Sequence, residues 1–455
     1  MIADIPVRTL VLTRRLIVDY EQIAGFQPAL AELLGKFRYC FKRQKTFGHW
    51  ERYILGLLAD LKRKSIEPIA LSAGVAVRTL QEFLAFFKWD DQKADQTLLR
   101  LIADGHTSEH AIGIIDATSH PKQGDQTPGV QRQWCGQSGK KDNCVVAQHL
   151  LYSDNHPTNP FNCVAASDLY LPKVWDQDRR RCRRAHIPDE VVYRCKWQIA
   201  IEQLERVIGQ GIRFEYVTFD EEYGRVPAFW FELDRLGQRA IGEVPANFYC
   251  WSKLPACQSL RSEHSAKTVE NLAAHSPVFC SQKWQRFEVK DTTRGKVVWD
   301  IKSGQVHLTI SKNKNGMNIS VPTDRQYWLI VGKNRDSGEI KYFVSNAPAS
   351  TLLEKLLSVA FSRWHIEQWF ERAKQECGLG AFEVRTYTSL IRHWLSARIA
   401  MYFLASQTQR LRGEKSTDHS GAGGRCGQYA GMENMGQIAA FVAASERTMC
   451  VLSGA

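Results

Sequence analysis

The hydrophobic pattern along the chain predicts an all-α region at its N-terminal end. Residues 1–107 carry apolar side chains at helical spacing, as in segment 50–58, and they lack the alternation that is typical of strands. Within this region, residues 66–87 fit a helix-turn-helix. Gly74 falls where the turn needs a permissive backbone, and Leu80 lies on the buried stripe of the second helix.

The exposed face of that second predicted helix bears on function. It would carry Arg78 and Gln81, whose side chains suit contacts with phosphates and base edges. Short helix-turn-helix patterns also arise by chance. The pattern alone therefore leaves two alternatives open, a DNA-binding unit and a plain helical hairpin.

Strands alternate with helices over residues 108–251, which is typical of an α/β domain. Two apolar runs, each closed by an acidic residue, predict buried strands that end at Asp116 and Asp220. The other predicted elements of this region are strands at 143–153, 160–171 and 239–244 and helices at 188–210 and 225–236.

A second change of pattern follows at residue 252. Residues 252–325 predict a β-rich insertion of short strands at 287–290, 297–301, 305–310 and 318–321, separated by polar turns. The α/β pattern returns over 326–409, with strands at 327–331 and 340–345 and a long helix from about Thr351. Residues 410–455 are rich in glycine and polar residues, and we expect a poorly ordered tail.

The net charge of the chain indicates which class of binding partner to expect. The chain has 60 Lys and Arg against 48 Asp and Glu, a net charge of +12 and a pI near 9.1. This excess favours nucleic acid first and an anionic membrane surface second. No run of about 18 apolar residues occurs, so we expect no membrane span. The 12 cysteines form no CxxC pair, which favours reduced thiols in a cytosolic protein over a zinc or disulfide framework.

Three acidic residues are candidates for phosphodiester chemistry. Two divalent ions about 3.5–4 Å apart can activate the attacking oxygen and stabilise the leaving oxygen, and Mg²⁺ prefers carboxylate ligands. Asp116 and Asp220 end predicted strands, and Glu367 lies on the predicted long helix. A single strand-ending Asp is weak evidence, because such residues usually cap a turn.

The spacing around Glu367 is more informative. Arg363, Glu367, Phe370 and Lys374 stand at i, i+4, i+7 and i+11 and would form one narrow stripe on a helix. An acid flanked by two bases, on a stripe beside the buried face of the helix, is an unusual arrangement that is compatible with a functional role. A ladder of salt bridges along the helix explains the spacing equally well.

Three ordered blocks resemble a known family. The segment that contains Arg363, Glu367 and Lys374 is similar to the Y-(2)-R-(3)-E-(6)-K signature of cut-and-paste insertion-sequence transposases, although Ala360 stands at the Tyr position. Residues 116–144 resemble the first catalytic block of the insertion sequence 701 group of DDE-superfamily endonucleases. Residues 219–224 resemble its second block, 378–393 resemble its continuation, and the resemblance covers about residues 30–405.

The resemblance implies a fold and an activity. The fold would be α/β, with an RNase H-like catalytic core interrupted by the β-rich insertion before the helix of the catalytic Glu. Asp116, Asp220 and Glu367 would hold two Mg²⁺ or Mn²⁺ ions, and Arg363 and Lys374 would grip phosphates near the cleaved end. The enzyme would cut DNA at terminal inverted repeats and join the 3′-OH ends to target DNA, as a homodimer on paired ends, in a bacterial cytoplasm at the nucleoid.

Further basic residues are candidate DNA contacts. Lys122 and Lys140 lie near the first acid in the sequence, and Arg179 and Arg180 begin a run of five arginines within residues 179–184. A solvated charged surface would explain that run as well, but DNA binding favours a phosphate-gripping loop.

Two other functions are alternatives to a transposase. A catalytically inactive DNA-binding protein derived from a transposase is the alternative, which the presence of all three acids disfavours. A general nuclease on the same core gives no reason for the R-E-K stripe.

Overall fold

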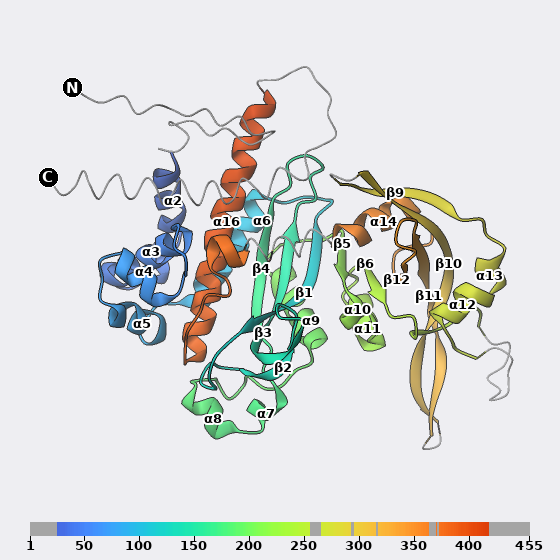
Figure 1. The fold of residues 1–455 in the computed structure, drawn as a ribbon, viewed down its shortest axis with the longest axis horizontal. Coiled ribbons are helices and arrows are strands. Elements are labelled where there is room, and N and C mark those ends of the chain that lie inside the picture. The colour runs from blue at the N-terminus through green and yellow to red at the C-terminus, as the bar shows by residue number, and fades with distance from the viewer. Residues whose placement is uncertain are drawn as a thin grey trace.

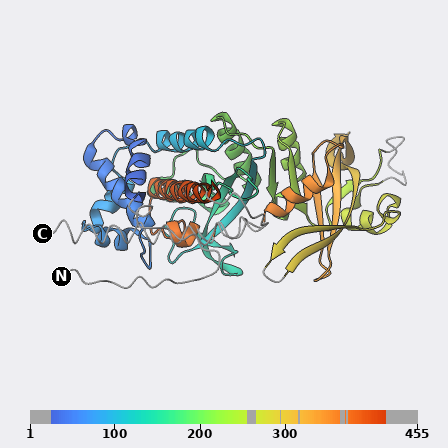
Figure 2. The ribbon, with the colours of Figure 1, turned by 90° about the horizontal axis from the view of Figure 1, so that it is seen from above.

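The structure, a computed structural model, describes residues 25–254, 265–292, 295–314, 317–363, 370 and 373–417. Helices gather at one end of the molecule and a β-rich region lies at the other, with a sheet between them (Figure 1). The view from above shows the same order, with the long helix α16 between the first helices and the sheet (Figure 2). None of the helices in these ranges has the length and apolar content needed to cross a membrane.

The N-terminal helices share one aromatic core. Phe41 and Phe83 both stack on Trp89, with ring centroids 4.9 and 6.0 Å apart, and Trp50 and Tyr53 are buried beside them. Burial of these large rings supplies the main driving force for packing short helices together. The elements are α2 (Phe26–Gly35), η1 (Arg38–Cys40), α3 (Gln44–Leu58), α4 (Ile66–Ser72), α5 (Val77–Ala85) and α6 (Asp91–Gly105).

Helices α4 and α5 occupy the segment in which a helix-turn-helix was expected. Gly74 lies in the turn between them with φ of 63°, a left-handed conformation that glycine adopts at little cost. Leu80 and Phe83 of α5 are fully buried, which fixes the helix against its neighbours. Arg78 and Gln81 lie on its exposed face.

A mixed sheet forms the centre of the molecule. Strand β1 (Ile112–Pro121) pairs antiparallel with β3 (Lys140–Ser153), which also pairs antiparallel with β2 (Gln131–Cys135) and β4 (Asn162–Leu169). On its other side, β1 pairs in parallel with β5 (Tyr216–Phe219), and β5 pairs in parallel with β6 (Ala240–Val244). The strand order β4-β3-β1-β5-β6 therefore puts β1 in the middle, where it is buried.

Helices cover this part of the sheet. Helix α9 (Lys196–Gly209) packs on β3 and β4, α11 (Pro227–Arg235) packs on α9, and α14 (Leu353–Ser362) packs on β5 and β6. Helix α16 (Tyr387–Thr417) packs on β4 with one side and on α3, α5 and α6 with others. Three short helices complete the region, α7 (Lys173–Asp176), α8 (Arg179–Arg184) and α10 (Glu221–Gly224).

The β-rich region continues the same sheet. Strand β12 (Ile340–Ser345) pairs antiparallel with β6, and β11, β10, β7 and β8 follow in order, with β9 paired to β10. Helices α12 (Val269–His275) and α13 (Pro277–Cys280) lie in the chain between β8 and β9. The remaining strands are β7 (Tyr249–Trp251), β8 (Lys267–Thr268), β9 (Gln285–Thr292), β10 (Gly295–Lys314) and β11 (Met317–Asn334).

The short strands expected in this region merge into longer ones. Those predicted at 297–301 and 305–310 belong to β10, and those at 318–321 and 327–331 belong to β11, so the predicted boundary at residue 325 falls inside a strand. The polar Ser303 and Gly304 do not end β10, because they pair with Ile330 and Leu329 across the hairpin. Pairing with a partner strand thus overrides the local turn signal.

Helix α16 also continues beyond the point where the tail was expected to begin. Residues 410–417 belong to it, and Leu411 is fully buried. Gln409 donates to Asp154 Oδ2 (2.9 Å), which ties this part of the helix to the end of β3. The possible tail residues after 417 lie outside the described residues.

Two buried arginines of α16 join the N-terminal helices to the sheet. The guanidinium of Arg398 pairs with Asp95 of α6 and donates to the carbonyl of Val164 in β4 (3.0 Å). Arg392 pairs with Asp91 of α6 (2.7 Å) and donates to the carbonyl of Phe87 (2.9 Å). Charge-assisted bonds of this kind fix geometry, because a buried charge that loses its partner is costly.

We expect Arg398→Met to weaken the fold strongly. The substitution leaves the carboxylate of Asp95 and the carbonyl of Val164 without their donor, which should lower the free energy of unfolding by about 3 kcal/mol. Urea denaturation followed by tryptophan fluorescence measures this. In the control Arg52→Met, an exposed arginine of α3 is replaced, and the change should stay within about 0.5 kcal/mol. Equal stability of the two variants would contradict the assignment.

Acid should destabilise the protein through His393. Burial lowers the pKa of this histidine to about 4, and its neutral ring accepts from Tyr53 Oη at Nδ1 (2.7 Å) and donates to the Gly378 carbonyl from Nε2 (3.0 Å). The unfolded chain binds the proton below about pH 6.5 and the fold does not, so stability falls as pH drops from 6.5 to 4, by about 3 kcal/mol for this group. Unfolding free energies at several pH values should show a shallower slope for His393→Gln; an unchanged slope would contradict this.

Candidate active site

Asp116 and Asp220 lie side by side because of the register between β1 and β5. The parallel pairing ends at Ile115 opposite Phe219, so each acid is the next residue on neighbouring strands. Asp116 does not end its strand as expected, since pairing with β3 carries β1 on to Pro121. Asp220 directly follows the last residue of β5, and its Oδ1 accepts from the backbone N–H of Glu222 (2.9 Å), so that Asp220 caps the short helix α10.

The two carboxyls repel each other in a half-buried setting. Burial is the main cause that raises the pKa of Asp116 to about 7, and the charge of Asp220 raises it further. Burial likewise raises the pKa of Asp220. The positive charge of Arg363 opposes both shifts. Two acids that share one nearby arginine form a site that would be stabilised by added positive charge.

Arg363 follows the last residue of α14, close to the edge of β6. Its Nη2 lies 3.9 Å from Glu243 Oε2, and Lys341 Nζ lies 3.1 Å from both carboxylate oxygens of Glu243. Glu367 lies outside the described residues, as do its neighbours at 364–366, 368–369 and 371–372. Within the ranges that are described, no three His, Cys, Asp or Glu side chains group in a way that could hold a metal ion.

The apolar member of the predicted stripe is buried. Phe370 packs against His149 of β3, with ring centroids 5.0 Å apart, and His149 is the cross-strand neighbour of Asp116. Lys374 is half-buried, and its charge is one of the causes that lower the pKa of His149. Phe370 and Lys374 thus both lie close to His149, the residue that pairs with Asp116 across the two strands.

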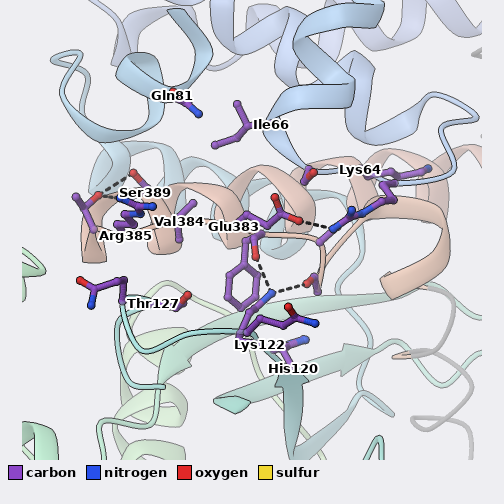
Figure 3. A pocket seen from close by; sticks show the side chains of 18 of the residues that line it. Lys64, Ile66, Gln81, His120, Lys122, Thr127, Glu383, Val384, Arg385 and Ser389 are labelled. Carbon is purple, nitrogen blue, oxygen red and sulfur yellow. Dashed lines mark hydrogen bonds and ion pairs between the residues drawn. The ribbon is translucent and has the colours of Figure 1, made fainter. Parts of the chain in front are cut away.

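A cleft of about 1390 Å³ opens beyond the end of β1 (Figure 3). Its walls come from α4 and α5, from the end of β1 with the loop that follows, and from segment 374–389. Four of the candidate DNA contacts line it together, namely Arg78, Gln81, Lys122 and Lys374. Segments more than 250 residues apart in sequence therefore form one surface.

Lys122 has a structural task in this cleft. Its ammonium donates to the carbonyls of Gly380 (3.1 Å) and Phe382 (2.6 Å) and lies 3.6 Å from the centre of the Phe382 ring. Burial lowers its pKa to about 8. The lysine thus joins the end of β1 to the segment after the Glu367 region, and two of its three donors are occupied by the protein itself.

The arginine run forms the helix α8 and its members differ in role. Asp178 caps the helix by accepting from the N–H of Arg181 (2.9 Å). Arg179 donates to the carbonyls of Pro188 and Val191 (both 3.1 Å), so it holds the following loop in place. Arg180 is exposed, and so is the remaining candidate contact, Lys140, at the start of β3.

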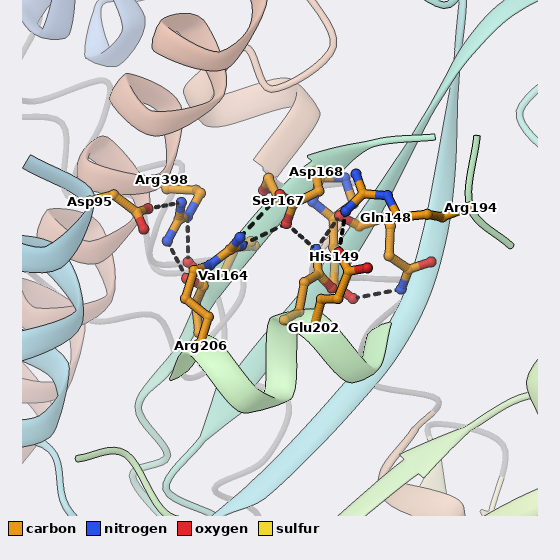
Figure 4. Close-up of polar contacts among 12 residues, drawn as sticks. Asp95, Gln148, His149, Val164, Ser167, Asp168, Arg194, Glu202, Arg206 and Arg398 are labelled. Carbon is orange, nitrogen blue, oxygen red and sulfur yellow. Dashed lines mark hydrogen bonds and ion pairs between the residues drawn. The ribbon is translucent and has the colours of Figure 1, made fainter. Parts of the chain in front are cut away.

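A buried hydrogen-bond network supports the backbone at Asp116. Gln148 Nε2 donates to the carbonyl of Asp116 (3.1 Å), while its Oε1 accepts from the hydroxyl of Tyr223. Gln203 of α9 donates to the carbonyl of Gln148 (2.9 Å) and to Asp168 (2.7 Å). Figure 4 shows Gln148 and Asp168 in this network, which sequence reasoning missed because its members come from separate elements.

Comparison with known proteins assigns the family. Residues 36–296 match the family model described as DDE superfamily endonuclease, a span that contains Asp116 and Asp220. The chain belongs to this family of endonucleases. It is also 25% identical over 379 residues, which are 80% of this chain and 86% of the relative, to the probable transposase for insertion sequence element IS701 of Microchaete diplosiphon. The expected resemblance of this DDE endonuclease to the insertion sequence 701 group is confirmed.

A solved structure is similar over most of the chain. The piggyBac transposase in its synaptic complex with hairpin DNA aligns with 95% of this endonuclease and 80% of its own chain, at 11% identity and a TM-score of 0.39.

The hydrogen bond between Tyr223 and Gln148, which supports the backbone at Asp116, should contribute to stability. In Tyr223→Phe, the fully buried Gln148 loses the donor to its Oε1, which should lower the free energy of unfolding by about 1–3 kcal/mol. Denaturation in urea measures the loss. Tyr249→Phe alters a tyrosine that is 55% exposed, and its effect should stay within about 0.5 kcal/mol. An unchanged free energy of unfolding in Tyr223→Phe would show that this hydrogen bond does not stabilise the fold.

Proposed function

We propose that this DDE endonuclease is a DNA transposase that cuts at the terminal inverted repeats of its element and joins the freed 3′-OH ends to target DNA. The observation that carries the proposal is the adjacency of Asp116 and Asp220 on neighbouring parallel strands, in a chain of this family. The IS701 relative adds support, since its name describes a probable transposase.

We further propose that the catalytic core is RNase H-like. The strand order β4-β3-β1-β5-β6 supports this, with β3 antiparallel to the central β1 and with β5 and β6 parallel to it. In this scheme the helical domain within residues 1–107 binds DNA. The β-rich strands that follow β6 separate Asp220 from Glu367 in the sequence.

Asp116 and Asp220, together with Glu367, would hold two Mg²⁺ or Mn²⁺ ions. The fit rests on the chemistry of the site, because burial raises the pKa of both carboxyls and the charge of Asp220 raises that of Asp116 further, so the pair gains from a shared cation. Carboxylate oxygens are the ligands that these hard ions prefer. When bound, such ions supply an activated oxygen nucleophile and charge stabilisation at the phosphorus.

The protein's own groups would position the DNA. Arg363 lies close enough to both acids to influence them, so its guanidinium can hold a non-bridging oxygen of the reacting phosphate. Lys374 would bind the backbone of the same strand from the edge of the cleft. Because both ends of an element must be cut together, two copies of the chain on paired ends form the working state.

Cleavage of a labelled duplex that carries the element's own terminal repeat tests this function. We expect nicking at the repeat end with Mg²⁺ or Mn²⁺ and none with EDTA. Asp220→Asn should reduce the rate at least about a thousand-fold, because removing a charged ligand costs several kcal/mol of transition-state stabilisation. The control Asp336→Asn alters an exposed acid in the turn between β11 and β12 and should cut as the parent does.

The outcome of this assay distinguishes an active transposase from an inactive DNA-binding protein. Binding of the repeat by the parent without cleavage under either metal would contradict the transposase proposal and favour an inactive DNA-binding protein. Retained cleavage in Asp220→Asn would contradict the assignment of this acid as a metal ligand.

A further inference from the structure

The cleft of Figure 3 joins the candidate recognition helix to the catalytic strand. Gln81 of α5 lies on one side of the cleft, and Lys122 and His120 at the end of β1 lie on the other. The side chain of Gln81 is exposed and makes no hydrogen bond to another described residue. An amide in this setting can form a bidentate pair with the edge of an adenine in the major groove.

The position of α5 is fixed by its buried face. Leu80, Phe83 and Leu84 are fully buried, while Arg78 and Gln81 point away from them. At its C-terminal end, Phe86 contacts His186, with ring centroids 6.2 Å apart. A helix packed through its buried face in this way presents its polar face to the cleft in a fixed orientation, as sequence readout requires.

The floor of the cleft contains a buried histidine whose ring packs against Phe382 and Trp394. His120 is 1% exposed, and neither of its ring nitrogens has a hydrogen-bond partner among the described residues. Buried polar groups are normally satisfied, so an unpaired imidazole that lines a cleft points to a ligand that supplies the bond. A nucleic acid offers both donors and acceptors to such a group.

Further exposed basic side chains lie on α8. Arg180, Arg183 and Arg184 are exposed and share one face of α8, at i, i+3 and i+4. Helix α8 is tied to the loop after β1, because Arg181 donates to the carbonyl of Asp125 (2.8 Å). Through this bond α8 contacts the loop that also lines the cleft, and its exposed arginines can hold phosphates without reading sequence.

The distance from the acids to the cleft can be obtained from the strand itself. His120 and Lys122 follow Asp116 by four and six residues, and a strand rises about 3.3 Å per residue, so they lie about 13 and 20 Å away. A duplex that runs along this line advances about 3.4 Å per base pair, which corresponds to about four to six base pairs.

We infer that α5 reads base pairs of the same DNA end that Asp116 and Asp220 of the same chain cut, about four to six base pairs from the cleaved bond. This inference rests on the proposed function, and it adds where along the end the sequence is read. Gln81, with Arg78 beside it, is the specificity-determining side chain. The arginines of α8 contact the backbone.

Binding measured in EDTA, where no cleavage can occur, tests this inference. Fluorescence anisotropy is recorded with a set of labelled duplexes of the element's terminal repeat, each with one base pair changed. For the parent, changes at pairs four to six should weaken binding by about 10- to 100-fold. For Gln81→Ala, this penalty should disappear at one or two of those pairs and remain at the others.

Arg180→Ala is the matched control, since loss of a phosphate contact should weaken binding to all duplexes equally and leave the positional profile unchanged. Thermal melting by circular dichroism checks that Gln81→Ala is folded. A Gln81→Ala profile identical to that of the parent would overturn the inference, and so would a changed profile confined to pairs outside about four to six. A different result would contradict the proposed function alone. In that case the parent would not cut DNA with metal, while Gln81→Ala would still change the positional binding profile as predicted, and readout by α5 would stand.

Discussion

The parallel pairing of β1 with β5 is the constraint on which the rest of this enzyme depends. It ends with Ile115 opposite Phe219, so the two next residues, Asp116 and Asp220, are held together on neighbouring strands. A slip of one residue in this register would move one acid to the other face of the sheet. Burial of both carboxyls, together with the charge of Asp220 beside Asp116, makes the ionised pair unfavourable without added positive charge. Divalent cations bound between the two carboxylates would offset this unfavourable electrostatic energy.

Helix α16 connects the sheet that carries Asp116 to the proposed DNA-binding helices. Its buried arginines Arg392 and Arg398 hold α6 and the other N-terminal helices against the sheet. The same docking brings α5 opposite the end of β1 and so forms the cleft. Lys122 holds the end of β1 against segment 374–389 by donating to the carbonyls of Gly380 and Phe382. Packing between parts that are distant in the sequence thus places the proposed recognition helix beside the end of the strand that carries Asp116.

The sequence predicted the features that depend on local pattern. Apolar runs closed by Asp116 and Asp220 correspond to β1 and β5, and Gly74 lies in the turn between two helices. Features that depend on a distant partner were missed, such as the full lengths of β10 and β11, which pair through Ser303 and Gly304. The same holds for Lys122 and Arg179, whose bonds to backbone carbonyls no sequence pattern marks. The role of Glu367 stays a prediction.

A crystal of the protein grown with Mn²⁺ and DNA, measured for anomalous scattering at the manganese edge, tests the central claim most directly. We predict an anomalous peak between β1 and β5, bonded to carboxylate oxygens of both Asp116 and Asp220. Manganese that binds elsewhere, or that contacts only one of these acids while the other faces away, would contradict the claim that this pair forms the metal-binding centre.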